Sequence, residues 1–231
     1  MRLSIIIPVF NECRTLPVLI SRIEAMQIEG TEKEIIFVDD GSTDGSREYL
    51  DSQKERYRVV FLGKNKGKGT AVRAGIEVAS GDYVLIQDAD LEYDPEDIPR
   101  LVSTAVKESL LVVYGSRILN PDNRRHSSAL AYIGGRALTL VTNLLFGLQL
   151  TDEPTCYKLF DRALLASLPL KARRFEFCPE VTAKVARKGI KIKEIPIRYN
   201  PRTWAEGKKI RWPDFFHALW VLIRERFGAS I

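Results

Sequence analysis

Four short apolar runs, each followed by polar or turn-forming residues, mark the first 90 residues of the chain. They cover residues 3–8, 34–38, 59–62 and 83–87, and continuous apolar runs of this length are typical of buried strands in a parallel sheet. The segments between them, residues 15–26, 46–55 and 70–79, place apolar side chains at helical spacing. This alternation predicts an α/β fold with a doubly wound, mostly parallel sheet and right-handed crossovers. Ligands are then expected at the carboxyl ends of the strands.

The second half of the chain has a less regular pattern. Strands are predicted at residues 111–115 and 191–199, and residues 155–160 form a candidate strand between them. The order in which these strands pair does not follow from the pattern. Residues 128–150 reach membrane-spanning length, but Arg136 lies near their middle, and a central arginine costs about 2.5 kcal/mol or more on insertion. We therefore predict a buried or interfacial segment.

Residues 210–227 form the last predicted element. Aromatic and aliphatic residues recur there at spacings of three and four, with lysine and arginine at both ends. This pattern predicts a basic amphipathic helix, and two interpretations stay open. Either the helix closes the core, or its apolar face docks in a lipid interface.

Composition narrows the class of protein. A length of 231 residues with 45% hydrophobic content fits one α/β domain. The balance of 35 Lys and Arg against 30 Asp and Glu gives a net charge of +5, which favours anionic partners. The three cysteines form no CxxC pair, so neither a disulfide framework nor a zinc site is predicted, and a reducing cytosol is favoured. The apolar run after Met1 is too short for a signal peptide and is predicted to be the first strand.

Two aspartates follow the fourth predicted strand. Asp88 and Asp90 are two positions apart, and in an extended segment such residues point the same way. Carboxylates with this spacing can hold Mg²⁺ or Mn²⁺ against a diphosphate, while water and phosphate oxygens complete the coordination. Glu92 is a candidate third ligand. The alternative is an ordinary solvated turn, in which aspartate is common.

Three lysines lie among glycines just before a predicted helix, in the segment KNKGKG at residues 64–69. Glycine lets backbone amides approach a ligand, and a helix N-terminus favours an anion, so the segment resembles a phosphate-approach loop. A flexible surface loop is the alternative. The sequence contains neither GxxxxGKS/T nor GxGxxG, which argues against a P-loop or dinucleotide-binding protein.

Several motifs together carry a family resemblance. They are IIIPVFNE at the first strand, VDDGSTDGS after the second, the block NKGKGTAVRAGIEVASGDYVLIQDADLEYDP, and GSR at residues 115–117. The sequence resembles the family 2 glycosyltransferases with the GT-A fold, a Rossmann-like sheet. Its late segment TWAEGKKIRW resembles in particular the dolichol-phosphate and polyprenyl-phosphate mannose and glucose synthases. The resemblance implies one GT-A domain over residues 1–231, ending in amphipathic helices. Residues 1–117 would form the nucleotide-sugar-binding half and residues 118–231 the acceptor-binding and membrane-interface half.

The resemblance also implies roles for individual residues. The expected nucleotide-sugar contacts are Pro8, Phe10, Glu12, Val38, Asp40, Asp88, Ala89, Asp90, Arg202 and Lys208. The expected ligands of Mg²⁺ or Mn²⁺ are Asp88, Asp90 and Glu92. Arg117 and Arg136 are expected at the acceptor phosphate, because a guanidinium binds phosphate in two contacts and stays charged. The candidate catalytic residues are Asp90, Arg117 and Asp152, where Asp152 orients the sugar or acceptor, or acts as a base if the acceptor is an alcohol.

The implied function is metal-dependent, inverting transfer of a hexose to dolichyl or polyprenyl phosphate at the cytoplasmic face of a membrane. Mannose from GDP-mannose is the first candidate. A polyprenyl phosphate is already an anion at neutral pH, so positioning and electrostatics can carry the reaction without a base. The alternatives are a UDP-sugar-dependent transferase, of glucose or N-acetylglucosamine, to polyprenyl phosphate or to a saccharide, and a non-catalytic nucleotide-sugar-binding protein.

The expected partners follow from this function. They are a nucleotide-sugar donor, a polyprenyl or dolichyl phosphate acceptor, a membrane surface and, as a further option, a separate membrane-anchoring subunit. Nucleic acid is not expected, because the basic residues are spread along the chain and no recognition motif is present. The expected location is cytoplasmic, with peripheral association to the membrane.

Overall fold

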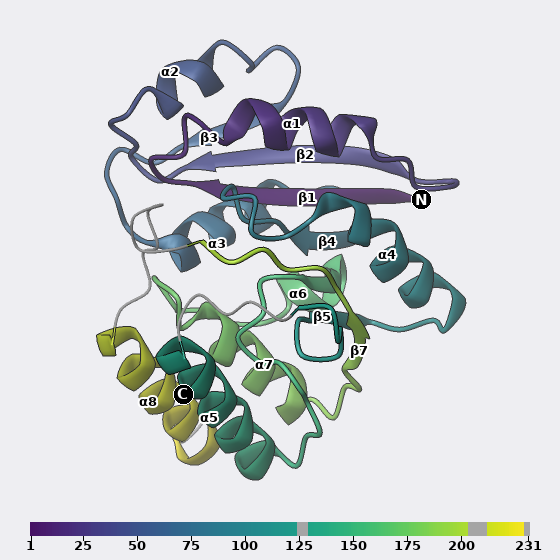
Figure 1. Ribbon diagram of the computed structural model, residues 1–231, viewed down its shortest axis with the longest axis vertical. Helices are drawn as coiled ribbons and strands as arrows, with labels where there is room; N and C mark the ends of the chain where they lie inside the picture. Colours follow the sequence, from purple (N-terminus) through teal and green to yellow (C-terminus); the bar gives the residue numbers. More distant parts are fainter. Residues whose placement is uncertain (124–128, 203–211, 229–231) are drawn as a thin grey trace.

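One sheet organises the protein, as a computed structural model shows for residues 1–123, 129–202 and 212–228 (Figure 1). Within these residues the sheet has seven strands in the order β3-β2-β1-β4-β6-β5-β7. The strands are β1 (Arg2–Val9), β2 (Glu32–Asp39), β3 (Arg58–Phe61), β4 (Tyr83–Ile86), β5 (Val112–Ser116), β6 (Lys158–Asp161) and β7 (Lys193–Pro196). Only β6 runs antiparallel to its neighbours, β4 and β5, so the predicted mostly parallel, doubly wound sheet is confirmed.

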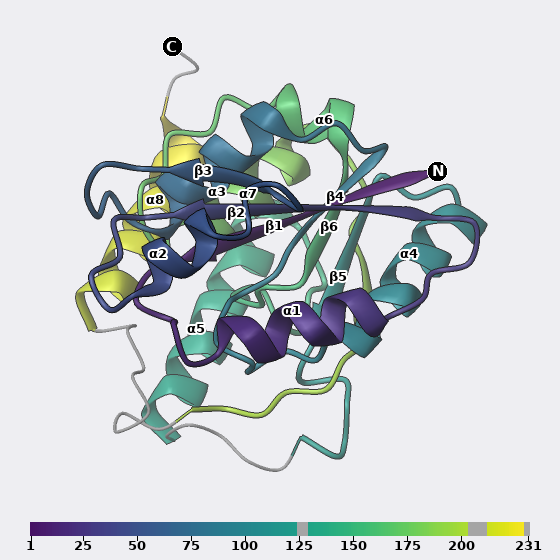
Figure 2. The same ribbon diagram turned by 90° about the horizontal axis from the view of Figure 1, so that it is seen from above.

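Helices cover both faces of the sheet. In Figure 2, α1 lies on one side of it, and α3 and α6 lie on the other. The helical elements of the described residues are α1 (Leu16–Ala25), α2 (Ser46–Asp51), α3 (Lys68–Val78), η1 (Pro95–Asp97), α4 (Ile98–Lys107), α5 (Ala129–Phe146), α6 (Arg162–Ala166), α7 (Phe177–Arg187) and α8 (Trp212–Phe227). This double cover explains why β1, which pairs with both β2 and β4, is buried from Leu3 to Val9.

Helix α3 packs very closely on β1. A Cβ atom added at Gly75 would lie 2.4 Å from Cγ2 of Ile6, so only glycine lets the helix approach to this distance. This contact fixes the start of α3, and with it Lys68, relative to the carboxyl end of β1.

A second, smaller core lies between α5, α7 and α8. Leu138, Ala183, Ala218 and Leu222 form it, and Figure 1 shows these three helices side by side below the sheet. The prediction that residues 210–227 form an amphipathic helix is confirmed in the described part. Ala218, Val221 and Leu222 are buried, while an outer stripe of α8 stays exposed.

No helix among the described residues combines the length and the apolar character needed to cross a bilayer. Residues 128–150, for which a buried or interfacial position was predicted, contain α5. Its Leu138 and Thr142 are buried, but Ile133, Leu140 and Leu144 are exposed.

Candidate active site

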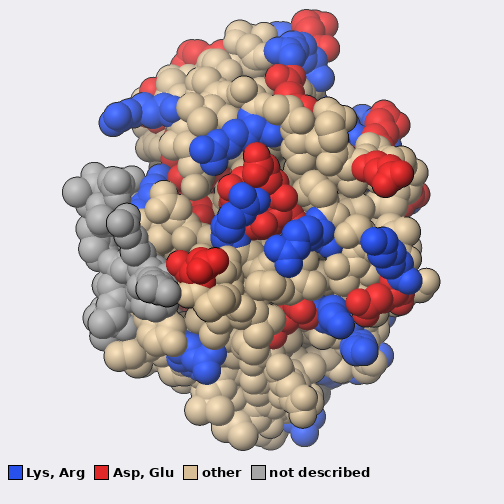
Figure 3. Space-filling model, turned by 45° about the vertical axis from the view of Figure 1, so that its right-hand side comes forward, with Lys and Arg blue, Asp and Glu red and all other residues tan. Residues whose placement is uncertain are grey.

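A cavity of about 1780 Å³ opens at the carboxyl ends of β1 and β4. Ligand pockets are commonly roughly 300–1,000 Å³, so this cavity has room for two substrates. Residues that follow the strands line one part of it, and α5 and α8 line another. Figure 3 shows basic and acidic side chains gathered in the middle of one face of the molecule.

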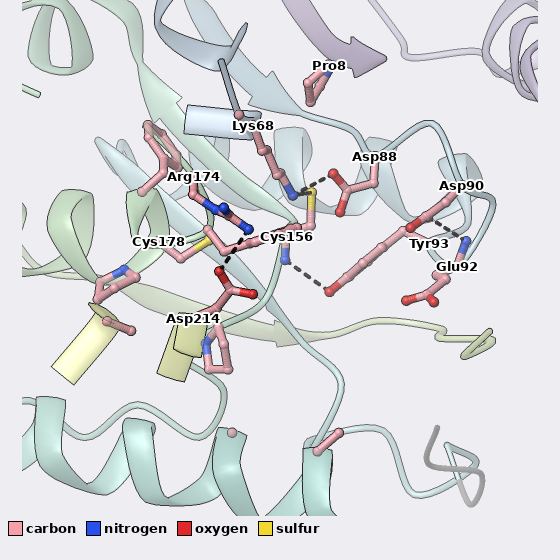
Figure 4. Close-up of a pocket in the computed structure, with 18 of the residues that line it drawn as sticks. Pro8, Lys68, Asp88, Asp90, Glu92, Tyr93, Cys156, Arg174, Cys178 and Asp214 are labelled. Atoms are coloured by element: carbon pink, nitrogen blue, oxygen red, sulfur yellow. Dashed lines mark hydrogen bonds and ion pairs between the residues drawn. The ribbon is translucent and has the colours of Figure 1, made fainter. Parts of the chain in front are cut away.

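The two aspartates after β4 form ion pairs with different basic side chains. Asp88 Oδ1 lies 2.5 Å from Nζ of Lys68, and Asp90 Oδ2 lies 3.0 Å from a guanidinium nitrogen of Arg202. In Figure 4, Asp88 points toward Lys68, while Asp90 and Glu92 lie together farther along the cavity. Strand β4 ends at Ile86, and residues 89 and 90 form a turn, so the alternation of a strand does not extend through Asp90. For this reason the expectation from sequence that both carboxylates face the same way does not describe the turn.

Negative charge is concentrated around Asp90. Burial, together with the charges of Asp88 and Glu92, raises the pKa of this carboxyl to about 7, although the charge of Arg202 opposes them. Carboxylate oxygens crowded in this way are the donors that Mg²⁺ and Mn²⁺ prefer, and one or two suffice when phosphate and water supply the rest. No three His, Cys, Asp or Glu side chains of the described part are already arranged around a metal position. The acids therefore fit a divalent cation whose remaining ligands are phosphate and water oxygens.

Glu92 is hydrogen-bonded to the segment that follows β7. Its carboxylate accepts hydrogen bonds from the hydroxyl of Tyr199, at 2.7 Å, and from the backbone N–H of Arg202, at 2.9 Å. Glu92 thus anchors the segment after β7 to the turn after β4.

Arg117 also lines the cavity, and Asp152 binds it. The Asp152 carboxylate accepts from the backbone N–H, Nε and a terminal nitrogen of Arg117, at 2.8, 2.7 and 2.6 Å. Burial alone would raise the pKa of Asp152, but the charge and hydrogen bonds of Arg117 outweigh it and lower this pKa. Asp152 is therefore an ionised partner of Arg117 at neutral pH.

Two side chains bind the backbone of the loop that carries Asp152. Glu194 accepts from the backbone N–H groups of Thr151 and Asp152, at 2.6 and 3.0 Å. Arg136 donates to the carbonyl of Thr151 at 2.9 Å. Arg117 and Arg136, both expected at an acceptor phosphate, thus contact adjacent residues of the same loop. The ring of Tyr199 covers Arg117 at 5.0 Å.

Most residues that the sequence suggested for the site line this cavity. They are Pro8, Phe10, Glu12, Asp40, Asp88, Ala89, Asp90, Glu92, Arg117, Arg136, Asp152 and Arg202. Val38 is fully buried in β2 and is not part of the lining. Lys208 lies outside the described residues. Asp40 lines the cavity, but its carboxylate accepts from the backbone N–H groups of Lys66 and Gly67, at 2.8 Å each.

The hypothesis of a phosphate-approach loop at residues 64–69 does not hold for the backbone amides of Lys66, Gly67 and Gly69, which are bonded within the protein. Besides the two amides that bind Asp40, those of Gly69 and Thr70 donate to the carbonyls of Arg174 and Arg173. A Cβ at Gly67 would meet the carbonyl oxygen of Arg173 at 2.5 Å. Gly67 and Gly69 therefore serve close packing against residues 172–174. The three lysines of the segment line the cavity, where Lys68 is paired with Asp88.

Sequence reasoning missed Tyr199 and Glu194 as parts of the site. No motif surrounds either residue, and both act through contacts with segments at least 40 positions away. Glu194 is the sole acid in β7, and a single acid does not distinguish a positioning residue from an ordinary strand residue.

Comparison with solved structures identifies the type of fold. The protein is similar to GT-A glycosyltransferase structures. One is glucosyl-3-phosphoglycerate synthase from Mycobacterium tuberculosis in complex with Mg²⁺ and UDP, with a TM-score of 0.74 at 20% identity, covering 99% of this chain and 80% of that one. The same enzyme in complex with Mn²⁺, UDP and phosphoglyceric acid gives a TM-score of 0.73 at 21% identity, covering 99% and 80%. At this identity the likeness concerns the fold.

Sequence comparison gives the family. The profile of "Glycosyl transferase family 2" matches residues 4–168, and this chain belongs to that family. It is 29% identical over 213 residues to dodecaprenyl-phosphate galacturonate synthase from Rhizobium johnstonii, covering 90% of this chain and 62% of the relative. It is 34% identical over 210 residues to undecaprenyl-phosphate 4-deoxy-4-formamido-L-arabinose transferase from Pectobacterium carotovorum, covering 89% and 62%. The chain thus spans about three fifths of the length of these curated relatives.

Proposed function

We propose that this protein transfers a sugar from a nucleotide donor to a polyprenyl phosphate, with inversion at the anomeric carbon and with Mg²⁺ or Mn²⁺ as cofactor. The observation that carries the proposal is one cavity that brings together the acids after β4 and the arginines at the loop of Asp152. The sequence relatives, which are named for polyprenyl-phosphate sugar transfer, support the same reaction.

The donor belongs at the carboxylate cluster. Asp90, with Asp88 beside it, would hold the divalent cation, which when bound neutralises charge on the departing nucleoside diphosphate. Pro8 and Phe10 border the same part of the cavity and offer it an apolar wall. Lys68 keeps Asp88 oriented through their ion pair.

The acceptor phosphate belongs at Arg117 and Arg136. One of its oxygens forms a bond to the anomeric carbon while the bond to the diphosphate breaks on the opposite face, which inverts the configuration. The phosphate is already ionised, so no side chain has to remove a proton. Asp152 then positions Arg117, in agreement with its three hydrogen bonds to that residue, and does not act as a base.

The lipid chain belongs along α5 and α8. Gly134, Gly135, Leu138 and Phe215 line this part of the cavity, and both helices continue into exposed apolar stripes. Amphipathic helices with basic residues bind membrane surfaces. We therefore propose peripheral association with the cytoplasmic face of a membrane, either directly or beside a separate anchoring subunit.

Two donors are candidates for the sugar. GDP-mannose follows from the resemblance to dolichol-phosphate mannose synthases. A UDP-linked sugar is the second candidate, because the relatives above are named for galacturonate and for 4-deoxy-4-formamido-L-arabinose, not for mannose. A saccharide acceptor is tested by the same experiment.

The test is transfer of radiolabelled sugar to a short polyprenyl phosphate and, in separate reactions, to a soluble saccharide, with Mg²⁺ or Mn²⁺ and with GDP-mannose, UDP-glucose and UDP-galacturonate in parallel. We expect product from one donor, loss of product with a metal chelator, and at least a hundredfold loss in Asp90→Ala. Asp51→Ala, an exposed aspartate on α2, is the control and should behave as the unaltered protein. Transfer to a saccharide, but not to the lipid phosphate, would replace the proposed acceptor. Donor turnover that is equally fast in Asp90→Ala would contradict the donor site.

A further inference from the structure

The guanidinium of Arg202 lies in the middle of the acidic cluster. It contacts Glu12 at 3.1 and 3.2 Å and Asp90 at 3.0 Å, and its Nε lies 3.7 Å from Glu92. Glu12 follows β1, whereas Asp90 and Glu92 lie in the turn after β4, so these acids come from parts of the chain that are distant in sequence. Arg202 therefore holds together the carboxylates that the proposed function gives to the donor and its cation.

We propose that Arg202 is an internal counter-ion that exchanges with the divalent cation: it leaves the carboxylates when metal and nucleotide bind together, and then binds the diphosphate. The inference rests on the proposed function for the class of donor. It adds that the nucleotide-free protein resists metal binding, and that Arg202 is the reason.

Charge is the first argument for this exchange. A guanidinium bound to Asp90 and Glu12 already neutralises part of the cluster, and a divalent cation that enters beside it meets repulsion between like charges. A nucleoside diphosphate brings its own negative charge. It offers Arg202 a new anionic partner with the planar, two-contact geometry that arginine prefers. Metal and nucleotide are thus expected to bind far more tightly together than apart.

The backbone around Arg202 gives the second argument. Its N–H donates to Glu92, the hydroxyl of Tyr199 donates to the same carboxylate, and the N–H of Tyr199 donates to Asn123. These bonds fix the main chain at the rim of the cavity while the guanidinium reaches across it. The exchange therefore needs a rotation of one side chain and no movement of the sheet.

A matched control lies four residues earlier. Arg198 also contacts three acids, Asp94, Glu96 and Asp97, each at 3.2 Å, but it does not line the cavity. Loss of Arg198 removes a similar network and leaves the carboxylates of the cavity unchanged.

The test measures Mn²⁺ binding by electron paramagnetic resonance, first without nucleotide and then with GDP or UDP. We expect Arg202→Gln to bind Mn²⁺ at least tenfold more tightly than the unaltered protein when nucleotide is absent, and Arg198→Gln to show no such gain. Nucleotide should raise the Mn²⁺ affinity of the unaltered protein strongly, and that of Arg202→Gln much less. Addition of Asp90→Asn to Arg202→Gln should abolish the gain.

Two results would overturn the proposal. One is a folded Arg202→Gln protein, with an intact circular dichroism spectrum, whose Mn²⁺ affinity without nucleotide equals that of the unaltered protein. The other is a gain that survives Asp90→Asn, which would place the metal elsewhere. Neither measurement involves an acceptor or turnover, so failure of the proposed transfer reaction is seen separately, in the radiolabel assay.

Discussion

At the scale of single residues, the pairing of Asp152 with Arg117 has the clearest consequences. Asp152 is almost fully buried, and three hydrogen bonds join it to Arg117. Removal of one charge from such a pair leaves the other without compensation, which costs about 3–5 kcal/mol when the pair is buried. Arg117 retains some exposure to solvent, so a cost at the lower end is expected.

We predict that Asp152→Asn lowers the free energy of unfolding by about 3 kcal/mol and raises KM for the lipid phosphate at least tenfold. Binding of nucleotide should not change, because the donor acids are not partners of Asp152. Denaturant unfolding and steady-state kinetics measure the two effects. Glu108→Gln, which breaks an exposed pair with Lys193, is the control and should cost less than about 1 kcal/mol. An unchanged KM would contradict the role given to Asp152.

Glu34 provides a test of pH dependence away from the cavity. Its carboxylate accepts from the hydroxyl of Ser4 and from the N–H and hydroxyl of Ser80. Burial alone would raise the pKa of Glu34, but these hydrogen bonds outweigh it and lower the pKa. The folded state then favours the ionised form, so the stabilisation is complete above the unfolded pKa, near pH 4.3, and is lost as pH falls through the lowered folded pKa.

Glu34→Gln is therefore expected to destabilise the protein at pH 7 by about 1–3 kcal/mol. The difference from the unaltered protein should shrink as the pH falls below about 4. Urea unfolding between pH 3 and pH 7 gives the comparison, with Glu29→Gln, an exposed glutamate, as control. A difference in stability that grows on acidification would contradict the lowered pKa of Glu34.

Several site residues were predictable one by one, but their partners were not. Asp88 and Asp90 stand out in the sequence because they follow a buried strand, and both line the cavity. Their cations, Lys68 and Arg202, come from the start of α3 and from the segment after β7. No local pattern shows which lysine or arginine reaches which carboxylate, since folding alone brings those segments together.

At the scale of elements, helix α5 contains an unusual pair of glycines. A Cβ at Gly134 would lie 4.0 Å from Phe215, and one at Gly135 would lie 3.5 Å from Pro154, so packing does not require glycine at either position. Each glycine nevertheless costs the helix roughly 0.5–1 kcal/mol relative to alanine. Both line the part of the cavity that we propose for the lipid chain, where a missing side chain leaves space for the acceptor.

Alanine at Gly134 or Gly135 should therefore stabilise the fold by about 0.5–1 kcal/mol and yet raise KM for the polyprenyl phosphate severalfold. Thermal unfolding and kinetics with varied acceptor measure the two opposite effects. Gly75→Ala is the contrasting variant, because its Cβ would collide with Ile6, and it should destabilise the protein. Stabilised variants with an unchanged acceptor KM would show that the lipid does not pass over α5.

The strands differ in how far the sequence predicts them. The runs at residues 3–8, 34–38, 59–62 and 83–87 match β1 to β4 closely, because apolar residues dominate each of them. β1 and β4 are buried along most of their length, while the edge strand β3 is partly exposed. The candidate at residues 155–160 overlaps β6, which begins at Lys158, and the run at residues 191–199 contains a strand of only four residues. For β6 and β7, pairing with strands that are distant in the sequence decides the structure, and such pairing leaves no periodic pattern.

At the scale of the whole molecule, two neighbouring helices expose apolar stripes. On α5 these are Ile133, Leu140 and Leu144, and on α8 they are Phe216, Trp220, Ile223 and Phe227. Exposed apolar stripes on neighbouring helices are typical of an interaction site. Together with the net charge of +5, they favour a membrane with anionic lipids.

We predict that the protein floats with anionic liposomes and that Leu144→Glu combined with Trp220→Glu lowers the bound fraction at least tenfold. Both side chains are exposed, so the fold should tolerate the change, and transfer to a short acceptor in detergent should persist. Val106→Glu, at an exposed apolar position on α4, is the control and should float normally. Equal flotation of all three proteins would exclude these stripes as the membrane contact.

The antiparallel strand β6 also has a consequence for biosynthesis. It lies between β4 and β5 in the sheet, but it follows both of them, and α5, along the chain. While the ribosome is still making the intervening segment, one edge of the apolar strand β4 has no partner. Such an edge can pair with another chain, and contacts so distant in sequence form slowly. Until Asp161 has emerged from the ribosome, we therefore expect the nascent chain to need protection by chaperones.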